Sequence, residues 1–310
     1  MIGNLPPIGP AAVCMGVFDG VHAGHRALLA AARDAAAAGG ATSVALVFDP
    51  HPDEVIHPGT RVPRLLPPGV VLRRIGQAGV DRPLPMTFDE DLKRLGAEEF
   101  LAALAPAIEV RWLVMSPESA FGRDRGGTPE RMRAHGRAAG FEVLVVDPVL
   151  VDGRPISSSR LRAALGTGDL PELARLGAAA YLEGTVIEGD RRGRELGFPT
   201  ANLRFEYVPA MPPRGIYTGL VSVPERGVGP GHPALVSIGV RPTFHDQGQL
   251  LVEAYLLDFD GDLYGATLEL ELRHRLRDEQ RFADAAALVA QMRRDEAEAR
   301  RLLASGRSVE

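Results

Sequence analysis

The sequence predicts an α/β N-terminal domain with a doubly wound parallel sheet, followed by an antiparallel β-barrel domain with a terminal helix. Three observations support this fold class. The length of 310 residues suggests two domains. Apolar strands alternate with helical segments in the first half, which indicates a parallel sheet. Strands at short spacing in the second half are typical of an antiparallel barrel. We place the domains at residues 1–178 and 179–310.

Composition excludes several classes of protein. A hydrophobic fraction of 45% is enough for ordinary cores, and a net charge of −5 argues against a general nucleic-acid binder. The single cysteine, Cys14, excludes an internal disulfide and a cysteine-based zinc cluster. Because neither a signal-peptide pattern nor an apolar run of membrane-spanning length is present, we expect a cytoplasmic protein without a membrane partner. The oligomeric state is left open.

The first strand, residues 11–15, leads through a glycine-rich connection into a helix expected from Arg26 to about Ala38. Strand, glycine-rich turn and helix form the phosphate-binding beginning of a doubly wound domain. His22 and His25 share a face because they are three apart at the helix start, and Gly24 leaves room for a phosphate. Two such imidazoles can stabilise charge developing on a triphosphate without acting as bases. A pair of surface histidines is the alternative.

The remaining elements of the first half continue the same alternation. A second buried strand at 42–48 ends at Asp49-Pro50-His51-Pro52, at the edge where such folds bind ligands. The segment 156–162 then opens a helix, where serines can cap the helix and bind phosphate, and where Arg160 can reach a triphosphate. A plain serine cap is the alternative. Further strands are expected at 110–115 and 141–146.

The segment Gly189–Asn202, GDRRGRELGFPTAN, concentrates glycines and arginines in one connection. Glycines let backbone amides approach a phosphate closely, and arginines supply charge. Pro199 keeps the local chain extended, so Thr200 and Asn202 point to the same side and can face one ion. Their neutral oxygens suit Mg²⁺ that already carries nucleotide phosphates. The alternative is a basic, glycine-rich surface turn.

Glu253 is unusual because it lies within the apolar strand Leu250–Leu257. Burying a carboxylate is costly unless it is paired or needed for function. The alternative is a barrel strand whose Glu253 face is wet. The segment Thr267–Leu272 alternates leucine with glutamate, as a half-buried strand does. The expected strands are 182–187, 215–223, 235–240, 250–258 and 267–276, and a final helix is expected over about 283–304.

The string GDRRGRELGFPTANL resembles the signature of the flavokinase (riboflavin kinase) family. The resemblance implies that Glu253 is the catalytic base and that Thr200 and Asn202 hold Mg²⁺. The segments 239–243 and 258–265 match the family too. The implied nucleotide- and phosphate-binding residues are Gly184, Gly189, Asp190, Gly193, Arg194 and Gly197, and the implied flavin-binding residues are Arg277, Glu279 and Phe282.

The strings GVFDGVHAGH and ISSSRLR resemble the nucleotidyltransferase module of bacterial FAD synthetases, which precedes a flavokinase in that family. The two resemblances together cover nearly the whole chain and are much more specific than the HxGH element alone. They imply that His22, His25 and Arg160 stabilise the transition state. The implied nucleotide-binding residues of this half are Gly16, Phe18, Asp19, Gly20, Gly24, Ser158 and Ser159.

The first half departs from the family pattern in three places. The loop Ser116–Gly122 lacks the usual glycine, Asn or Asp, and aromatic residue before Phe121; Val47 replaces a threonine; and Ala178–Ala180 replaces Arg-Pro-Tyr. The phosphate-handling residues remain while flavin-facing ones differ. We therefore expect a weaker or altered grip on FMN.

We interpret the chain as a bifunctional enzyme with riboflavin, FMN and ATP as substrates and Mg²⁺ as cofactor. One half moves the ATP γ-phosphoryl to the riboflavin 5′-hydroxyl, and the other joins AMP to FMN with release of pyrophosphate. Two alternatives remain. One is a riboflavin kinase whose first half is degenerate or altered in specificity, and the other is a non-catalytic regulator that binds flavin or nucleotide.

Overall fold

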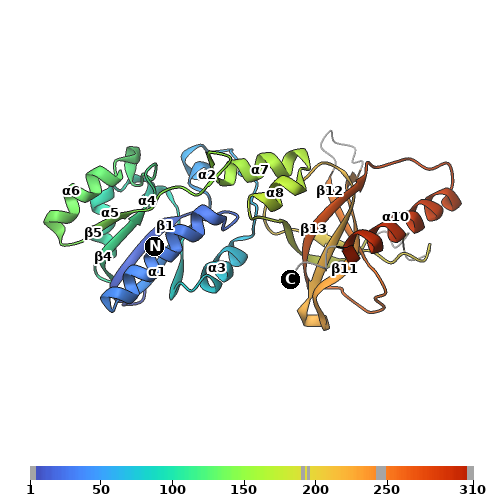
Figure 1. Ribbon diagram of the computed structural model, residues 1–310, viewed down its shortest axis with the longest axis horizontal. Coiled ribbons are helices and arrows are strands. Elements are labelled where there is room, and N and C mark those ends of the chain that lie inside the picture. Colours follow the sequence, from blue (N-terminus) through green and yellow to red (C-terminus); the bar gives the residue numbers. More distant parts are fainter. Residues whose placement is uncertain (1–4, 190–192, 194–195, 242–248, 306–310) are drawn as a thin grey trace. The chain divides into compact units, whose positions relative to one another are not determined.

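The computed structural model describes residues 5–189, 193, 196–241 and 249–305, and it divides the chain into two compact units, 1–160 and 161–310 (Figure 1). Each unit is described by itself. The expected boundary between residues 178 and 179 stays a prediction.

The first unit is built around a parallel sheet with strand order β3-β2-β1-β4-β5. The order reverses at β1, which pairs with both β2 and β4, so the doubly wound sheet predicted from the sequence is confirmed. A two-stranded hairpin, β6 with β7, lies outside this sheet. The strands are β1 (Gly9–Gly16), β2 (Thr42–Asp49), β3 (Arg82–Thr87), β4 (Ile108–Met115), β5 (Glu142–Val145), β6 (Leu150–Val151) and β7 (Arg154–Pro155).

Helices connect the strands of this sheet. The first of them, α1, begins after His22 as its N-cap and ends at Gly40, whose left-handed backbone is the usual helix terminator. The strand β3 was not predicted because two prolines interrupt its apolar pattern, and it lies at a sheet edge, where proline is tolerated. The helices are α1 (Ala23–Gly39), α2 (Pro52–Ile56), α3 (Pro68–Gln77), α4 (Glu90–Arg94), α5 (Ala97–Leu104), α6 (Pro129–Ala139) and α7 (Ser158–Thr167), which runs into the second unit.

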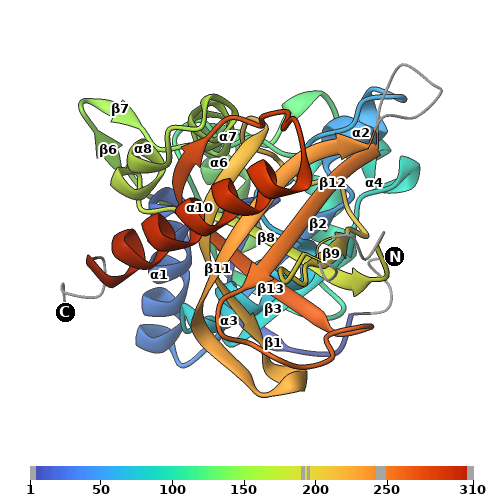
Figure 2. The same ribbon diagram turned by 90° about the vertical axis from the view of Figure 1, so that its right-hand side faces the viewer.

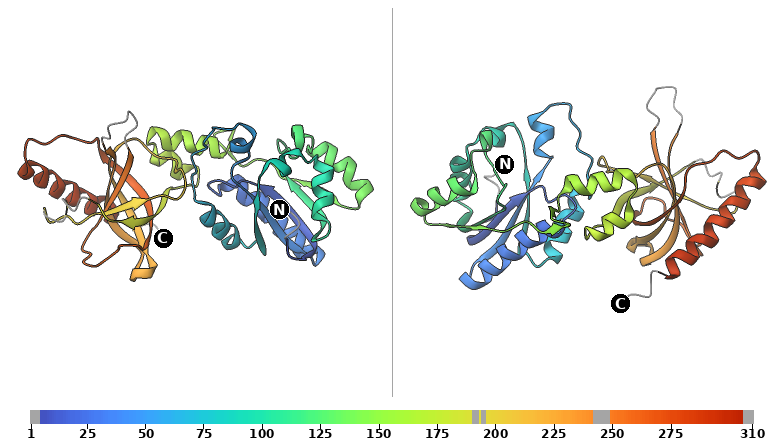
Figure 3. Two further views of the ribbon diagram at one scale, coloured as in Figure 1. Left: turned by 180° about the vertical axis from the view of Figure 1, so that it is seen from behind. Right: turned by 45° about the horizontal axis from the view of Figure 1, so that its top comes forward.

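The second unit contains a closed barrel of strand order β10-β11-β12-β9-β8-β13, as the short strand spacing predicts. The terminal helix α10 lies on the outside of this barrel, against β11 and β13 (Figures 2 and 3). The elements are α8 (Leu170–Arg175), β8 (Ala180–Ile187), β9 (Ala201–Arg204), β10 (Gly215–Val223), β11 (Val228–Arg241), β12 (Gln249–Leu256), β13 (Thr267–Arg277) and α10 (Ala285–Ser305).

Alternation along the barrel strands decides which side chains reach the core. On β13, Leu268, Leu270 and Leu272 are buried, as predicted. On β12, the buried residues include Val252 and Ala254, so Glu253 between them points to the other side and is half-buried. The fully buried carboxylate considered from the sequence is therefore not what the structure shows.

Two candidate active sites

The two histidines of the N-terminal turn lie in direct contact. The ring of His22 stacks on the ring of His25 with centroids 3.6 Å apart and an interplanar angle of 18°. The Nδ1 atom of His22 also accepts a hydrogen bond of 3.3 Å from the backbone N–H of His25, so that His22 caps α1. The structure therefore brings the predicted pair together at a helix N-terminus, where backbone N–H groups favour anions.

Both histidines are neutral at pH 7. Burial, with a smaller contribution from Arg26, lowers the pKa of His22 to about 4. Burial and the neighbouring His22 ring lower the pKa of His25 well below its usual value. The Nδ1 atom of His25 is buried without a hydrogen-bond partner in the described part of the chain. The pair can thus offer neutral imidazole groups to a ligand rather than a positive charge.

The residues that surround the pair come from two segments. Phe18 and Asp19 are buried within the turn. The carboxylate of Asp19 accepts a hydrogen bond from the backbone N–H of Leu65, far along the chain. A Cβ on Gly24 would lie 3.2 Å from the His22 ring, so a small residue is needed there. Gly20 has a left-handed backbone conformation, which glycine adopts more readily than other residues.

The start of α7 reaches the same turn. The hydroxyl of Ser158 donates a 2.8 Å hydrogen bond to the backbone oxygen of Asp19, while Ser159 is exposed in the first helical turn. Arg160 donates from Nη1 to the backbone oxygens of Val151 and Arg154, at 3.1 and 3.2 Å. Arg160 therefore holds the β6–β7 hairpin in this structure, and its predicted contact with a phosphate stays a prediction.

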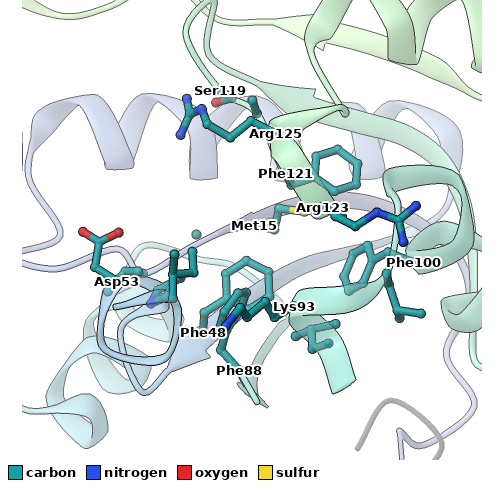
Figure 4. Close-up of a pocket in the computed structure, with 18 of the residues that line it drawn as sticks. Met15, Phe48, Asp53, Phe88, Lys93, Phe100, Ser119, Phe121, Arg123 and Arg125 are labelled. Atoms are coloured by element: carbon teal, nitrogen blue, oxygen red, sulfur yellow. The ribbon is translucent and has the colours of Figure 1, made fainter. Parts of the chain in front are cut away.

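A cavity of about 850 Å³ opens beside the turn, where β1, β2 and β4 end. Gly16 is one of the residues that line it, and phenylalanine rings form part of its walls (Figure 4). The rings of Phe48 and Phe88 meet edge to face at 5.8 Å, as do those of Phe100 and Phe121. The charged side chains around it include those of Asp53, Lys93, Arg123 and Arg125, and His51 lines it as well. Its size and aromatic walls suit a flat, conjugated ring system.

The loop that departs from the family pattern forms one wall of this cavity. The hydroxyls of Ser116 and Ser119 are 2.7 Å apart and close a tight turn. Ser119, Ala120 and Phe121 of the same loop line the cavity. The departure therefore changes the composition of a wall, and a cavity is present despite it.

The second site lies where β9 pairs with β12. The hydroxyl of Thr200 donates a 3.3 Å hydrogen bond to Oε1 of Glu253, and Asn202 is the direct cross-strand partner of Glu253. Asn202 is 95% buried, yet its Oδ1 atom has no hydrogen-bond partner within the described residues. A buried, unpaired oxygen is costly unless a ligand completes it.

Thr200 and Asn202 line a cavity of about 560 Å³ in the barrel unit. Gly189 also lines it and packs directly on the Asn202 amide, leaving no room for a Cβ. The far wall is the segment 259–264, which carries Asp260 and Asp262. Within the described ranges, no group of three or more His, Cys, Asp or Glu side chains could hold a metal ion.

The other glycines of this connection shape the backbone. The backbone oxygen of Gly193 accepts hydrogen bonds from Leu196 and Phe198, and Gly197 has a left-handed backbone. A Cβ on Gly184 would lie 2.8 Å from the backbone oxygen of Arg204. Glycine at this position therefore permits the close pairing of β8 and β9. The predicted residues Asp190 and Arg194 lie outside the described residues.

The predicted flavin-binding residues lie at the end of β13 and beyond it. Arg277 forms a bidentate ion pair with buried Asp295 of α10, with a shortest distance of 2.7 Å, and its guanidinium lies over the Phe282 ring. Glu279 packs against Gly239 of β11. None of the three lines the cavity of Thr200 and Asn202.

Comparison with known proteins identifies the family. A family model described as FAD synthetase matches residues 7–160, and one described as riboflavin kinase matches residues 176–303. A bifunctional riboflavin kinase/FMN adenylyltransferase from Pseudomonas fluorescens is 38% identical over 94% of this chain and 92% of its own length. The chain belongs to the bifunctional riboflavin kinase/FMN adenylyltransferase family. Both halves match, which supports the bifunctional interpretation over the two alternatives.

Another member of the family agrees with this assignment, and one solved structure has the same fold. The enzyme from Listeria monocytogenes is 34% identical over 94% of this chain and 92% of its own length. A crystal structure described as a macrolide-efflux protein from Streptococcus pneumoniae has a TM-score of 0.85 and 30% identity, covering 96% of each chain. Across the described residues, every helix is too short or too polar to cross a membrane.

Sequence reasoning did not find the aromatic cavity of the first unit. Its phenylalanines lie at the end of β2, in the connection that follows β3, on α5 and in the loop after β4. No local motif joins them, because they converge only through the sheet. A sequence signal existed at Phe48, which precedes the Asp-Pro-His-Pro segment at the predicted ligand edge, and in the flavin-facing loop that contains Phe121.

Proposed function

We propose that this protein makes FMN from riboflavin in its barrel unit and FAD from FMN in its α/β unit, with ATP as the donor in both steps. The observation that carries the proposal is that each matched family segment contains a cluster of polar side chains suited to phosphate chemistry. The stacked histidines lie in the FAD synthetase segment, and the Thr200–Glu253 pair lies in the riboflavin kinase segment.

In the kinase step, Glu253 takes the proton of the riboflavin 5′-hydroxyl, and that oxygen forms a bond to the γ-phosphorus of ATP. The bond from the γ-phosphorus to the bridging oxygen breaks, which releases ADP. The hydrogen bond from Thr200 fixes the rotamer of Glu253 near β9. Half-burial keeps the carboxylate accessible to a substrate hydroxyl.

The barrel site also fits Mg²⁺. Asn202 Oδ1 is buried and unpartnered, and the hydroxyl oxygen of Thr200 retains lone pairs after donating to Glu253. Two neutral oxygens together with nucleotide phosphates make the oxygen-rich environment that Mg²⁺ prefers. When bound there, Mg²⁺ would neutralise charge on the β- and γ-phosphates. Because Gly189 has no side chain, its backbone can lie directly against the Asn202 amide.

In the adenylyl transfer step, an oxygen of the FMN phosphate forms a bond to the α-phosphorus of ATP, and pyrophosphate leaves. FMN itself is the nucleophile, so no covalent enzyme intermediate is needed. His22 and His25, at the N-terminus of α1, stabilise charge on the triphosphate as neutral donors. The isoalloxazine ring occupies the aromatic cavity, with the ribityl phosphate toward Gly16.

Incubation of the purified protein with riboflavin, ATP and Mg²⁺, followed by chromatographic separation of the flavins, tests this proposal. We expect FMN to accumulate first and FAD to follow with release of pyrophosphate. FMN without FAD would refute the second step, and neither product would refute both.

A further inference from the structure

The turn between β1 and α1 contains a buried carboxylate that accepts hydrogen bonds from backbone amides. Asp19 is 2% exposed. Its Oδ1 atom accepts from the N–H groups of Leu65 and Leu66, at 2.9 and 3.2 Å, and its Oδ2 atom accepts from Leu65 at 3.2 Å. A free carboxylate would repel the phosphates of ATP. Here the backbone amides donate hydrogen bonds to the carboxylate and stabilise its charge.

Two residues close to Asp19 in the turn have costly backbone conformations. Phe18 has φ of 52° and Val21 has φ of 40°, in the left-handed region that side chains other than glycine rarely adopt. Val21 is β-branched, which makes this conformation more unfavourable. Strain of this kind persists only where the surroundings fix the backbone, and it is concentrated at functional sites.

Asp19 holds this backbone in place through hydrogen bonds of its side chain and of its backbone oxygen. Its side chain binds Leu65 and Leu66, and this segment is itself tied to the end of β2, because Nη2 of Arg64 forms a 2.9 Å ion pair with Asp49. Its backbone oxygen accepts from Ser158 at the start of α7. Asp19 thus joins the ends of β1 and β2 to the first turn of α7.

The strained backbone places a side chain behind the histidine pair. The ring of Phe18, 2% exposed, meets the ring of His25 edge to face at 5.3 Å, and His25 in turn stacks on His22. Moving Phe18 would therefore move the His25 ring, whose Nδ1 atom is buried and unpartnered.

We propose that Asp19 is a positioning residue for adenylyl transfer, which acts through Phe18 on the orientation of His25. The proposal rests on the function proposed above for the histidine pair. It differs from the phosphate-binding role that the family resemblance implies for Asp19, because the carboxylate accepts hydrogen bonds from the backbone amides of Leu65 and Leu66.

Steady-state kinetics of Asp19→Ala and Asp19→Asn test the proposal in the full-length protein. A catalytic group displaced by about 1 Å can cost about 10²-fold in rate. We expect Asp19→Ala to lower kcat for FAD formation by about that factor, with KM for FMN changed less than about twofold. Asp19→Asn keeps an oxygen at the Oδ1 position for both amides, so it should recover most of kcat.

Two internal controls separate positioning from general damage. Kinase activity of the same polypeptide reports the integrity of the barrel unit and should stay unchanged. Asp81 is a matched carboxylate in the same unit, since it accepts from the backbone N–H and hydroxyl of Ser43 at 2.9 and 2.6 Å at the other end of β2. Asp81→Ala should leave kcat for FAD formation unchanged.

Phe18→Leu carries the test if Asp19→Ala fails to fold. It removes the ring edge against His25 and should lower kcat roughly 10-fold, a smaller loss than full displacement gives. In Asp19→Ala and in Phe18→Leu, the imidazole NMR signals of His25 should shift.

The proposal is overturned if Asp19→Ala retains wild-type kcat, if Asp81→Ala loses as much, or if Asp19→Asn is as impaired as Asp19→Ala. A raised KM for ATP with unchanged kcat would overturn it in favour of direct nucleotide binding. The absence of FAD formation by the wild-type protein would instead refute the proposed function.

Discussion

Each half of this enzyme has a glycine-rich connection after a β-strand, but the two halves assemble their candidate sites differently. In the α/β unit, the ends of β1, β2 and β4 converge at one sheet edge, so the walls come from distant parts of the chain. In the barrel, antiparallel pairing of β9 and β12 sets Asn202 directly opposite Glu253. The site of the α/β unit depends on the convergence of distant segments at one sheet edge. The site of the barrel depends on the register of two paired strands.

The polar groups of the two sites differ in the same way. The histidine pair is held neutral by burial, with its rings stacked. Glu253 is half-buried and receives a hydrogen bond from Thr200. We infer that the first site stabilises charge and the second also moves a proton.

Glu253→Gln should abolish most kinase activity and leave adenylylation of supplied FMN intact. Loss of a general base costs about 10²- to 10⁴-fold in rate. FMN formation from riboflavin is the measurement, and Glu271→Gln is a matched control because Glu271 is also half-buried on a barrel strand and paired, with Arg273. Near-normal FMN formation by Glu253→Gln would remove Glu253 as the base.

His25→Ala should lower FAD formation by about 10²- to 10³-fold and leave FMN formation unchanged, because it removes a group that stabilises developing charge. Pyrophosphate release with FMN and ATP is the measurement. His135→Ala is the matched control, since His135 of α6 also packs edge to face on an aromatic ring, that of Phe141. Equal losses from both substitutions would contradict the assignment.

Asn202→Ala and Thr200→Ala should each raise the Mg²⁺ concentration needed for half-maximal kinase rate, by roughly 10-fold. Excess Mg²⁺ should partly restore turnover, because the remaining oxygen and the phosphates still bind the ion. Titration of kinase activity with Mg²⁺ measures the effect, with Thr185→Ala of β8 as a barrel threonine outside the cavity. An unchanged Mg²⁺ dependence in both site variants would rule out the shared ion.

The α/β unit should lose stability on acidification. The pKa of His22 is about 4 in the folded state and 6.5 when exposed, so the unfolded chain binds more protons between these values. Stability is therefore complete above pH 6.5 and falls as the pH drops toward 4, by about 2 kcal/mol at pH 5 for this histidine. Thermal unfolding measured at pH 7 and pH 5 checks this, and His22→Asn should reduce the difference.

The contrast between the sites also explains what the sequence could predict. Thr200 and Asn202 are close in sequence and their extended spacing places them together, so their pairing was predictable. The stacking of His22 on His25 follows from their spacing at a helix start. The aromatic cavity was not predictable, because Phe48, Phe88, Phe100 and Phe121 meet only after the sheet forms.

The partners of Asp19 and Arg160 were hidden for a different reason. Both belong to motifs that suggest phosphate contact, yet the structure uses the Asp19 carboxylate to hold Leu65 and Leu66 and uses Arg160 to hold the β6–β7 hairpin. A motif fixes the identity of a side chain but not the direction in which it points. Only the distant segments that supply the partners decide that.

We infer that one chain carries two independent sites that act in sequence. Mixing Glu253→Gln with His25→Ala tests this inference, with riboflavin, ATP and Mg²⁺ supplied and FMN and FAD followed in time. Neither variant alone should form appreciable FAD, whereas the mixture should form FAD after a lag during which free FMN appears. A mixture that makes no FAD, although each variant keeps its own single activity, would contradict the claim.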